Sequence, residues 1–592
     1  MMIAITGAGI ISAIGNDKKS VLRALQNGET GVGGMQHLHS THDELPVGEV
    51  KLTNCELKRK TGLPDDALIS RTALLGIDAT KQALEEAGLT AEKVAAHKLK
   101  VVFISGTTVA GMDITEEHFD DAAKSDGCDC AFISQHECGR CTETIAGYFD
   151  GIFCDCTTIS TACSSAANAI MLGARLLAEG DADIVVAGGA EALSRFHLNG
   201  FNALMILDHE RCRPFDSSRA GLNLGEGAAY IVMAREDTAV RLGNKPSAYL
   251  TGYGNACDAF HQTASSANGE GAYRAMSEAL NVAGLLPKDI QYVNAHGTGT
   301  PSNDKSESAA LRRVFGEAMP AVSSTKSYTG HTTSASGSIE AVICILALRY
   351  GLIPGNGGWS SSDEECINPT STVNKAELRH VMCNSFGFGG NDTSLIISSE
   401  ATGQATTAQK VERHRVKVAA IVEITDESEL SEVREFVTPM EARRMGKLAK
   451  GATLSSLKAL RKAGLDAPDA IVSGTRFGCL VNTERILTQM EGGREESISP
   501  TDFMQSTHNT IGGGIAIKLK CHGYNVTYSH CKDSLRWAIN DAEMLIESGK
   551  CKSVLVGCHD EMSPIFGKLL ERNGEKPQLP IHSTAIVLVR ND

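Results

Sequence analysis

Apolar residues along this chain follow two alternating patterns. Short runs rich in β-branched residues occur at residues 101–106 and 183–188, and longer stretches with helical spacing that end at a glycine occur at residues 70–88 and 165–180. The short runs are typical of buried strands, and the long stretches are typical of helices with one apolar face. The alternation of the two predicts an α/β protein.

One predicted corner between a strand and a helix carries a thiol. The sequence TTISTACSSAANAIMLGARLLAEG, residues 157–180, begins as a strand and turns helical directly after Cys163. At the first turn of a helix, the unpaired N–H groups and the positive end of the helix dipole favour a thiolate. We therefore expect a lowered pKa and a nucleophilic role for Cys163, in place of the usual role of a small buried core residue.

Three polar loops follow predicted strands further along the chain. His296 lies in YVNAHGTGTPSND, Lys326 and His331 lie in VSSTKSYTGHTTSASGSIE, and the third loop is NSFGFGGND at residues 384–392. A lone histidine in a loop is usually structural. Three such loops, each at the end of a strand and each with a different reactive group, favour a catalytic site shared with Cys163.

Composition narrows the function further. The 592 residues are 42% hydrophobic and 21% charged, which is typical of a globular chain with more than one domain. The net charge of −15 gives no support to nucleic-acid binding. No apolar segment of about 18 residues lacks charges, and the first residues lack a basic region, so we expect no membrane span and a cytoplasmic location. The glycines of residues 3–15 do not match the dinucleotide fingerprint, which argues against NAD binding.

Cysteines are frequent but do not form a spaced framework. Most of the 18 lie singly in strand-like or helix-like runs, which suits a reducing compartment. Six lie within residues 128–156, near His136, and only Cys138 and Cys141 have C-x-x-C spacing. Two hypotheses remain open for this segment, a zinc site and a cysteine-rich surface excursion.

The reactive loops belong to a longer series of motifs. TACSS, RPFD, GEGAA, HGTGT, KSYTGH and NSFGFGG occur in this order between residues 161 and 390. The series resembles that of the β-ketoacyl-[acyl-carrier-protein] synthases of the elongating Cys-His-His class, and the resemblance covers residues 1–400. It implies the thiolase fold, in which two similar βαβαβαββ halves form five layers, αβαβα. It also implies an acyltransferase without a metal or a bound cofactor, because the phosphopantetheine is carried by the partner acyl carrier protein.

The resemblance implies a role for each reactive group. Cys163 would carry the acyl chain, and backbone N–H groups near Cys163 and Phe388 would hold the oxyanion. His296 and His331 would stabilise the enolate that forms when malonyl-acyl carrier protein loses CO₂, and a Claisen condensation would give the 3-oxoacyl product. The supporting residues implied are Lys326 and its acidic partner Glu340, the pantetheine contacts Thr298 and Thr300, and the gate residues Phe386 and Phe388.

The last third of the chain is a degenerate repeat. Residues 401–414 are polar, as a linker would be, and a second domain is predicted at residues 415–592. Its segment LIESGKCKSVLVGCHDEMS matches LLAEGDADIVVAGGAEALS at an offset of 369 residues, which places Lys532 opposite Cys163. A slip of one residue would place Cys531 there instead. The domain resembles the short, inactive chain-length-factor-like partners of aryl-polyene ketosynthases, and its length allows one thiolase-type half.

Chain elongation could serve fatty-acid, polyene or other polyketide synthesis. Two other functions are alternatives to chain elongation. One is a non-catalytic scaffold that binds acyl carrier proteins, and the other is a thiolase acting on CoA esters, which would need a second catalytic cysteine. The expected partners are acyl carrier protein and acyl and malonyl thioesters, with a homodimer or a pairing of synthase and partner domain. Residues proposed to dock the acidic carrier protein are Lys58, Arg59, Lys60 and Arg71.

Overall fold

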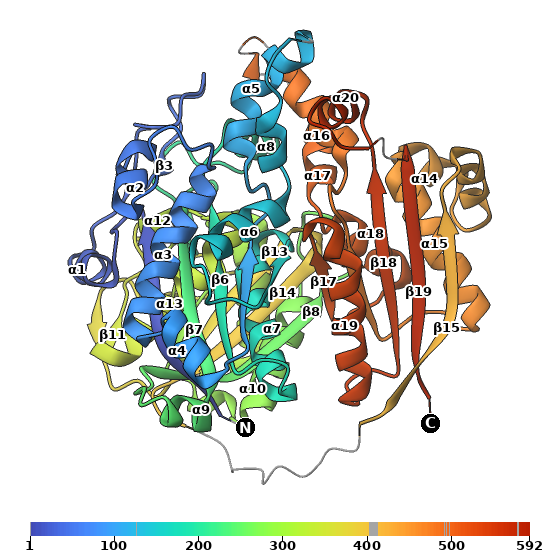
Figure 1. Ribbon diagram of the computed structural model, residues 1–592. Helices are drawn as coiled ribbons and strands as arrows, with labels where there is room; N and C mark the ends of the chain where they lie inside the picture. The colour runs from blue at the N-terminus through green and yellow to red at the C-terminus, as the bar shows by residue number, and fades with distance from the viewer. Residues whose placement is uncertain are drawn as a thin grey trace.

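Three stretches of the chain repeat one order of strands and helices, βαβαβαββ. The computed structural model describes residues 2–125, 127–401, 413–490, 492, 494–495, 498–576 and 579–591 (Figure 1). The first stretch holds β1 (Ile3–Ser12), α3 (Arg71–Ala87), β4 (Val101–Gly106), α6 (Cys138–Tyr148), β5 (Asp155–Ile159), α7 (Ser165–Glu179), β6 (Ile184–Glu191) and β7 (Gly227–Arg235).

The second and third stretches contain equivalent elements. The second holds β8 (Ala248–Cys257), α10 (Glu270–Ala283), β9 (Tyr292–Asn294), α11 (Pro301–Phe315), β10 (Ala321–Ser323), α13 (Ser336–Tyr350), β13 (His380–Gly387) and β14 (Asn391–Ser398). The third holds β15 (Arg415–Ile424), α15 (Lys447–Ala463), β16 (Ala470–Gly474), α18 (Thr510–Leu519), β17 (Asn525–Tyr528), α19 (Ser534–Glu547), β18 (Ser553–Glu561) and β19 (Ile581–Asn591). The predicted linker, residues 401–414, lies outside the described residues from 402 to 412.

Each stretch forms five strands in the same spatial order, third, second, fourth, fifth, first. These orders are β5-β4-β6-β7-β1, β10-β9-β13-β14-β8 and β17-β16-β18-β19-β15. Short antiparallel contacts join the three sets into one 15-stranded sheet, β1 to β8 at Ile3–Ile5 and β5 to β17 at Ile159. A degenerate repeat after residue 414 was therefore correctly predicted, and it repeats one half of the preceding fold.

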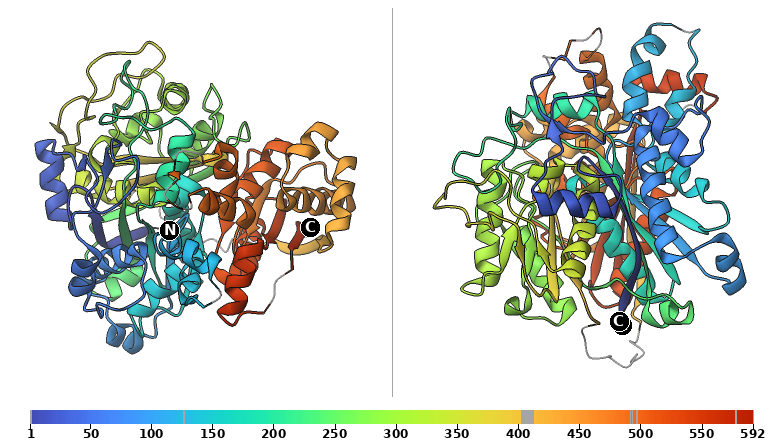
Figure 2. Two further views of the ribbon diagram at one scale, coloured as in Figure 1. Left: turned by 90° about the horizontal axis from the view of Figure 1, so that it is seen from above. Right: turned by 90° about the vertical axis from the view of Figure 1, so that its left-hand side faces the viewer.

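The first two stretches stack in five layers. The helices α7 and α13 pack against each other between the two sets of strands, α3 covers the outer face of β1 and β7, and α10 covers the outer face of β8 and β14. The third stretch lies beside these layers, not on top of them (Figure 2). Within the described ranges, no helix is long and apolar enough to cross a membrane.

Capping residues explain where the two predicted long helices begin and end. The Ser70 side chain accepts a hydrogen bond from the Ala73 N–H, and Gly88 ends α3 in the left-handed conformation, with φ 56°. Gly180, with φ 82°, ends α7 in the same way. Eleven of the first thirteen residues of α7 have apolar or small side chains, the exceptions being Asn168 and Arg175, and all thirteen are buried, which suits a helix between two sheets.

The third stretch joins the first through a symmetric backbone contact between β5 and β17. The Ser160 N–H donates to the Thr527 carbonyl at 2.9 Å, and the Ser529 N–H donates to the Thr158 carbonyl at 3.0 Å. Both donors and both acceptors are related by the same offset of 369 residues. Reciprocal contacts of this kind define a two-fold axis, so the chain forms an internal pseudo-dimer.

The same symmetry identifies the counterpart of the predicted nucleophile. Ala162 and Cys531 both have positive φ, 53° and 47°, and each is the first residue of the turn that opens a helix. The next residues are Cys163 and Lys532, so the slip that would have placed Cys531 at the nucleophile position is excluded. Lys532 is exposed, and burial raises the pKa of Cys531 far above its ordinary value.

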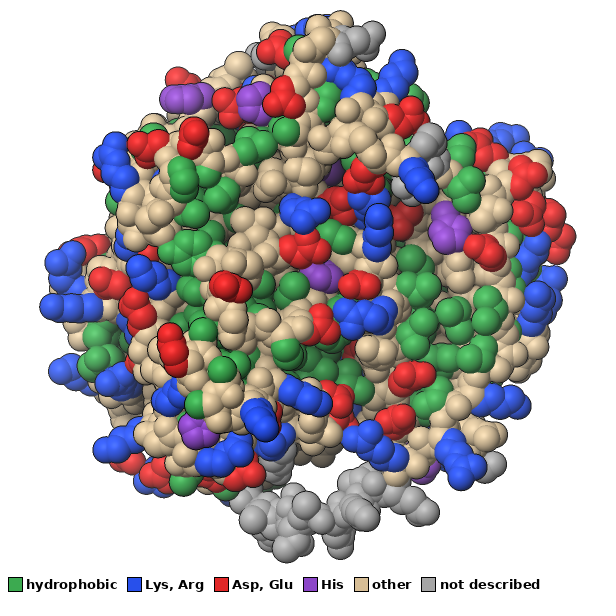
Figure 3. Space-filling model, viewed as in Figure 1, with side chains coloured by type: hydrophobic (Ala, Val, Ile, Leu, Met, Phe, Trp, Pro, Cys, Tyr) green, Lys and Arg blue, Asp and Glu red, His purple; other side chains and the backbone are tan. Residues whose placement is uncertain are grey.

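Among the described residues, no second half covers the third stretch. Three residues of α7, all buried, have polar counterparts in α19: Arg536, Asn540 and Glu543 stand where α7 has Ala167, Met171 and Ala174. On edge strand β15, Val418 and Ile421 remain 53% and 56% exposed. Hydrophobic side chains gather over the β18, β19 and β15 part of the molecule (Figure 3). Thus α19 carries polar residues where α7 is apolar, whereas β15 still exposes apolar side chains.

A buried ion pair fastens α7 to α19. Arg175 donates to the Asp541 carboxylate, whose other oxygen accepts from the Tyr524 hydroxyl at 2.7 Å. The two charged side chains are 7% and 0% exposed. A second pair across the same junction, Arg536 with Asp155 at 3.2 Å, is about 40% exposed on both sides. The two pairs therefore allow a direct comparison of buried and exposed charges.

We predict that Asp541→Ala lowers the free energy of unfolding by about 3 kcal/mol, because it leaves the buried Arg175 guanidinium without its counter-charge. The exposed pair should contribute less than about 1 kcal/mol, so Asp155→Ala serves as the control. Urea unfolding followed by circular dichroism measures both. Equal effects of the two variants would contradict a dominant role for the buried pair.

Candidate active site

Cys163 lies in a tight turn between β5 and α7. A turn at Ala162–Ser164 links the two elements, and the Ser165 hydroxyl accepts the Thr161 N–H at 2.9 Å and donates to the Ala162 carbonyl at 2.6 Å. These bonds hold Ala162 in its positive-φ conformation. The turn thus fixes the thiol at the corner predicted from the sequence, where it is 6% exposed.

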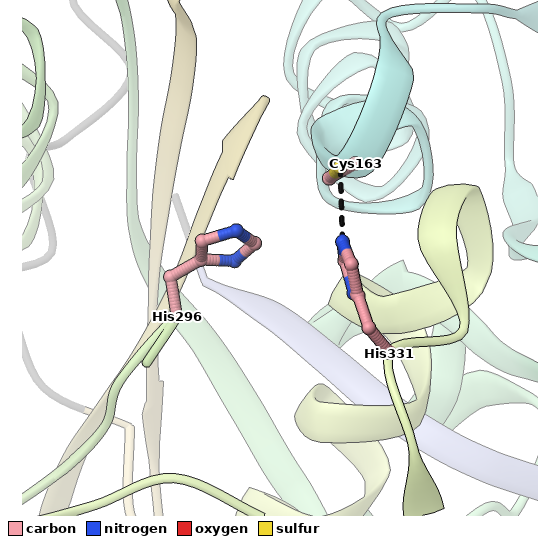
Figure 4. A group of neighbouring side chains, drawn as sticks. All are labelled: Cys163, His296 and His331. Carbon is pink, nitrogen blue, oxygen red and sulfur yellow. Dashed lines mark hydrogen bonds between the residues drawn. The ribbon is translucent and has the colours of Figure 1, made fainter. Parts of the chain in front are cut away.

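Two histidines from the second stretch face this thiol (Figure 4). His331 Nε2 lies 3.1 Å from the Cys163 sulfur, and its Nδ1 lies 3.0 Å from the Ser336 hydroxyl. The rings of His296 and His331 are 5.4 Å apart and nearly perpendicular, at 84°. His296 follows β9, and His331 follows the short helix α12 (Lys326–Thr329). Three distant segments therefore converge on one point, as the motifs predicted.

A buried lysine lies behind the histidines. Lys326 Nζ is 2.5 Å from the Glu340 carboxylate, and both residues are buried. Burial raises the pKa of Glu340 to about 7, against the opposing effect of Lys326. Burial also lowers the pKa values of His296 and His331, and the Lys326 charge lowers them further. Both imidazoles are therefore neutral at physiological pH and can accept or donate a proton.

A cavity of about 360 Å³ opens at this cluster. Among the residues that line it are Cys163, His296 and His331 and all four predicted substrate contacts, Thr298, Thr300, Phe386 and Phe388. Its apolar wall includes Phe201 and Leu204, and Phe201 stacks on Phe388 at a ring distance of 5.7 Å. A more open hollow of about 430 Å³ beside residues 12–17 holds none of these groups. The cavity thus combines reactive groups with an apolar wall suited to an acyl chain.

Comparison with known families agrees with this site. Models of the β-ketoacyl synthase N-terminal and C-terminal domains match residues 1–239 and 247–359, and a second N-terminal domain model matches residues 418–590. The 3-oxoacyl-[acyl-carrier-protein] synthase 2 of Vibrio cholerae serotype O1 is 34% identical over 414 residues, which are 67% of this chain and 98% of the relative. The chain belongs to the β-ketoacyl synthase family. The namesake enzyme of Staphylococcus aureus (strain COL) is 31% identical, with 67% and 97% covered.

Solved structures extend the likeness to both parts of this synthase. The ishigamide ketosynthase/chain length factor matches with a TM-score of 0.62 and 29% identity, covering 67% of this chain and 99% of that chain. The ketosynthase ApeO, in complex with its chain length factor ApeC from Xenorhabdus doucetiae, matches at 0.58 and 31%, with 67% and 98% covered. The PfaC keto synthase-chain length factor matches at 0.79 over 100% of this chain and 78% of that chain, at 17% identity, which compares the fold alone. The thiolase fold with an added ketosynthase-like half is confirmed.

One expectation for the nucleophile was wrong. Burial raises the pKa of Cys163 to about 12, and it outweighs the Lys326 charge and the N–H groups of Phe388 and Cys163 that favour the thiolate. The helix N-terminus and the Lys326 charge stabilise the thiolate, but the loss of solvation on burial is the larger effect here. In the free synthase Cys163 is a neutral thiol, and His331 is placed to take its proton during attack.

Two positioning groups had no motif of their own in the sequence. Glu307 accepts hydrogen bonds from the backbone N–H groups of His296 and Gly297 at 2.9 and 2.7 Å, and burial raises its pKa to about 7. Ser336 lies beside His331 Nδ1 and, as a hydroxyl, serves either tautomer. The sequence could have indicated both, because each is a polar residue in a predicted helix that directly follows a loop with a catalytic histidine.

One of the proposed docking residues is not available on the surface. Arg71 is buried and forms a two-point ion pair with Glu226, with Nη2 to Oε1 at 2.6 Å and Nε to Oε2 at 2.9 Å. Lys60 binds the buried Asp78 at 2.8 Å, and Lys58 donates to the Asp65 carbonyl at 2.7 Å. Sequence reasoning placed Arg71 outside because an isolated arginine gives no sign of an acidic partner 155 residues later.

The cysteine-rich segment does not gather into a metal centre among the described residues. Cys138 lies 3.9 Å from His508 Nε2 and Cys156 lies 3.8 Å from His530 Nε2, two separate contacts with the third stretch. In the part of the chain that the structure describes, one group has metal-like spacing, Cys163, His296 and His331, whose donor atoms lie within 4.8 Å of one another. The predicted absence of a metal remains a prediction.

We predict that the alkylation of Cys163 by iodoacetamide accelerates about tenfold per pH unit from pH 7 to 10, without a plateau. Only the thiolate reacts, and a pKa near 12 keeps its fraction rising throughout this range. Peptide mass spectrometry of the alkylated Cys163 gives the rate, and a small thiol such as N-acetylcysteine provides the comparison. A plateau below about pH 9 would show that the helix dipole dominates after all.

Proposed function

We propose that this synthase elongates an acyl chain by decarboxylative Claisen condensation. The main support is the placement of Cys163, His296 and His331 around one cavity whose wall is apolar. In the first step the Cys163 sulfur attacks the carbonyl carbon of an acyl thioester while His331 Nε2, 3.1 Å away, accepts the thiol proton. The pantetheine thiol leaves with that proton, and the acyl chain remains on Cys163.

The second step requires groups that stabilise negative charge on a carbonyl oxygen. Malonyl thioester loses CO₂, and the electron pair of the broken C–C bond forms an enolate. The imidazoles of His296 and His331 are neutral, so each can donate a hydrogen bond from a ring N–H group to the enolate oxygen without needing a counter-anion of its own. The Nδ1 atom of His296 is buried and has no hydrogen-bond partner among the described residues, so one ring nitrogen of this residue is unsatisfied without a substrate.

In the third step the enolate carbon attacks the acyl-Cys163 carbonyl. A new C–C bond forms, the oxyanion lies near the N–H groups of Cys163 and Phe388, and the Cys163 thiolate leaves and takes up a proton from solvent. The product is a 3-oxoacyl thioester two carbons longer. Acyl carrier protein is the proposed carrier, as in the names of the relatives, and it brings the phosphopantetheine, so the synthase needs no bound cofactor of its own.

Two observations weigh against the alternatives. A scaffold without catalysis does not need a buried Lys326–Glu340 pair beneath two neutral histidines. A thiolase needs a second cysteine at the cavity, whereas Cys163 is the one cysteine among the described lining residues and Cys383 lies buried in β13 with its sulfur toward the Gly337 carbonyl. A cytoplasmic location completes the proposal, because all 18 cysteines are free.

The third stretch is proposed as a non-catalytic partner that shapes the acyl pocket. It replaces a second subunit at the β5 edge, which favours pairing within the chain over pairing of two synthase domains. Its Phe503 ring lies on Gly200, where a Cβ atom would come within 2.2 Å, and packs against Phe201 at 5.3 Å. Because Phe201 lines the cavity, Phe503 supports the cavity wall from behind.

We predict that Cys163→Ala abolishes acyl transfer and elongation, and that His296→Ala and His331→Ala each slow malonyl decarboxylation by about 10²- to 10³-fold. Release of CO₂ from malonyl-acyl carrier protein and the mass of the acylated protein measure the two steps. Cys383→Ala, at another buried cysteine, is the control and should remain active. Elongation by the Cys163 variant would refute the mechanism, and loss with the Cys383 variant would favour the thiolase.

We predict that Phe503→Ala lengthens the longest acyl chain that Cys163 retains, because it removes the support behind Phe201. Intact-protein mass after incubation with a series of acyl-acyl carrier proteins measures the retained chain. Phe566→Ala is the control, since this equally buried ring of the same domain packs against Phe119 and His136, away from the cavity. An unchanged chain-length limit in the folded Phe503 variant would argue against the pocket-shaping role.

A further inference from the structure

The loop that carries Phe388 is held by both parts of the chain. Residues 387–390 lie between β13 and β14, at the wall of the cavity, and Gly389 has φ 81°. The Phe388 carbonyl accepts a hydrogen bond from Asn509 Nδ2 at 2.8 Å, and the Gly389 N–H donates to the Gln262 carbonyl at 2.7 Å. One peptide unit, from Phe388 to Gly389, is thus fixed at its two ends by a residue of the third stretch and a residue of the second.

The contact with Asn509 is close and buried. Asn509 is 2% exposed and directly precedes α18, whose Gly513 lies so near Gly389 that a Cβ atom would approach the Gly389 carbonyl oxygen to 2.9 Å. In the other direction, a Cβ atom on Gly389 would approach Asn509 Nδ2 to 2.9 Å. Because glycine is needed on both sides, the loop and the start of α18 fit one another at backbone distance.

A second set of hydrogen bonds connects Asn391, the residue after this loop, to the turn that carries Cys163. The Asn391 side chain donates to the Asn525 carbonyl of β17 and accepts from the Ser164 hydroxyl at 2.9 Å. Asn168 of α7 donates to the same Asn391 oxygen at 2.8 Å. The start of β14, the Cys163 turn and the third stretch therefore share one buried network of hydrogen bonds.

The restrained peptide lies next to the group that faces the reacting atom. Phe388 and Cys163 both line the cavity, and the Phe388 N–H favours the thiolate form of Cys163. This N–H belongs to the peptide that precedes the one held by Asn509. Rotation about Phe388 would move this N–H away from the position of the oxyanion. A donor aimed in advance at that position is effective only if it stays there.

We propose that Asn509 is a positioning residue for the condensation reaction: through its bond to the Phe388 carbonyl, the non-catalytic domain holds the oxyanion donor of the synthase site in place. This inference rests on the proposed function, since it concerns the acyl-transfer step at Cys163. It assigns the domain a part in the rate of the reaction in addition to its part in the shape of the pocket. The Asn509 side chain does not touch the reacting atoms, so its effect is transmitted through the Phe388 backbone.

Two reactions of Cys163 separate this role from a general structural one. Acyl transfer from an acyl-acyl carrier protein or a p-nitrophenyl ester forms an oxyanion, whereas alkylation by iodoacetamide displaces iodide and forms none. We expect Asn509→Ala in the full chain to slow acyl transfer about 10- to 100-fold and to slow alkylation by a smaller factor, because the Phe388 N–H also favours the thiolate that is alkylated. Asn509→Leu keeps a similar shape but has no hydrogen-bond donor, so it should show the same selective loss.

The control is a second buried amide of the same domain. Asn482 is 7% exposed and donates to Asp502 at 2.8 Å, within the third stretch, so Asn482→Ala should leave both reactions unchanged. Unchanged acyl transfer in the folded Asn509 variants, or an equal loss of acyl transfer and alkylation, would overturn the inference. If the Ala variant does not fold, the Leu variant decides. Absence of acyl transfer in the unaltered protein would instead refute the proposed function.

Discussion

The pairing of β5 with β17 is the contact on which the rest of the molecule depends. An edge strand exposes unpaired N–H and carbonyl groups that must find partners, and here a strand of the same chain supplies them through Ser160 and Ser529. The nucleophile follows β5 after a three-residue interval, so the strand that forms the junction also places Cys163. The same strand therefore contributes both to the pseudo-dimer junction and to the position of the nucleophile.

The two sides of this junction have diverged in physical character while keeping one topology. On the synthase side α7 is buried between two sheets, and on the other side α19 carries polar residues because the second half that would cover it is missing among the described elements. Val418 and Ile421 are exposed on β15, which is the counterpart of β1. In the synthase, β8 of the second half pairs with β1. The half-domain packs on the synthase instead, through the buried Arg175–Asp541 pair and through the contact of Phe503 with Phe201.

Local pattern was enough to predict much of this structure. Periodicity and glycine stops located α3 and α7, motif order located the three loops, and a constant offset located the counterpart of Cys163. The errors have a common cause. Burial decided the pKa of Cys163 and the partner of Arg71, and burial depends on segments more than 100 residues away that no local pattern specifies. Asn509 was missed for the same reason, because its partner Phe388 is 121 residues distant.

The electrostatics of the site follow from the same burial. Cys163, His296 and His331 are almost fully buried, and burial keeps each of them neutral, while the Lys326–Glu340 pair supplies the nearby fixed charge. Neutral donors suit an enolate better than an ion pair would, since no charge must be separated before the substrate loses CO₂. The burial that raises the cysteine pKa includes the apolar wall that we propose accepts the acyl chain. The third stretch completes that wall through Phe503, so a domain without a nucleophile still contributes to the dielectric environment in which the nucleophile reacts.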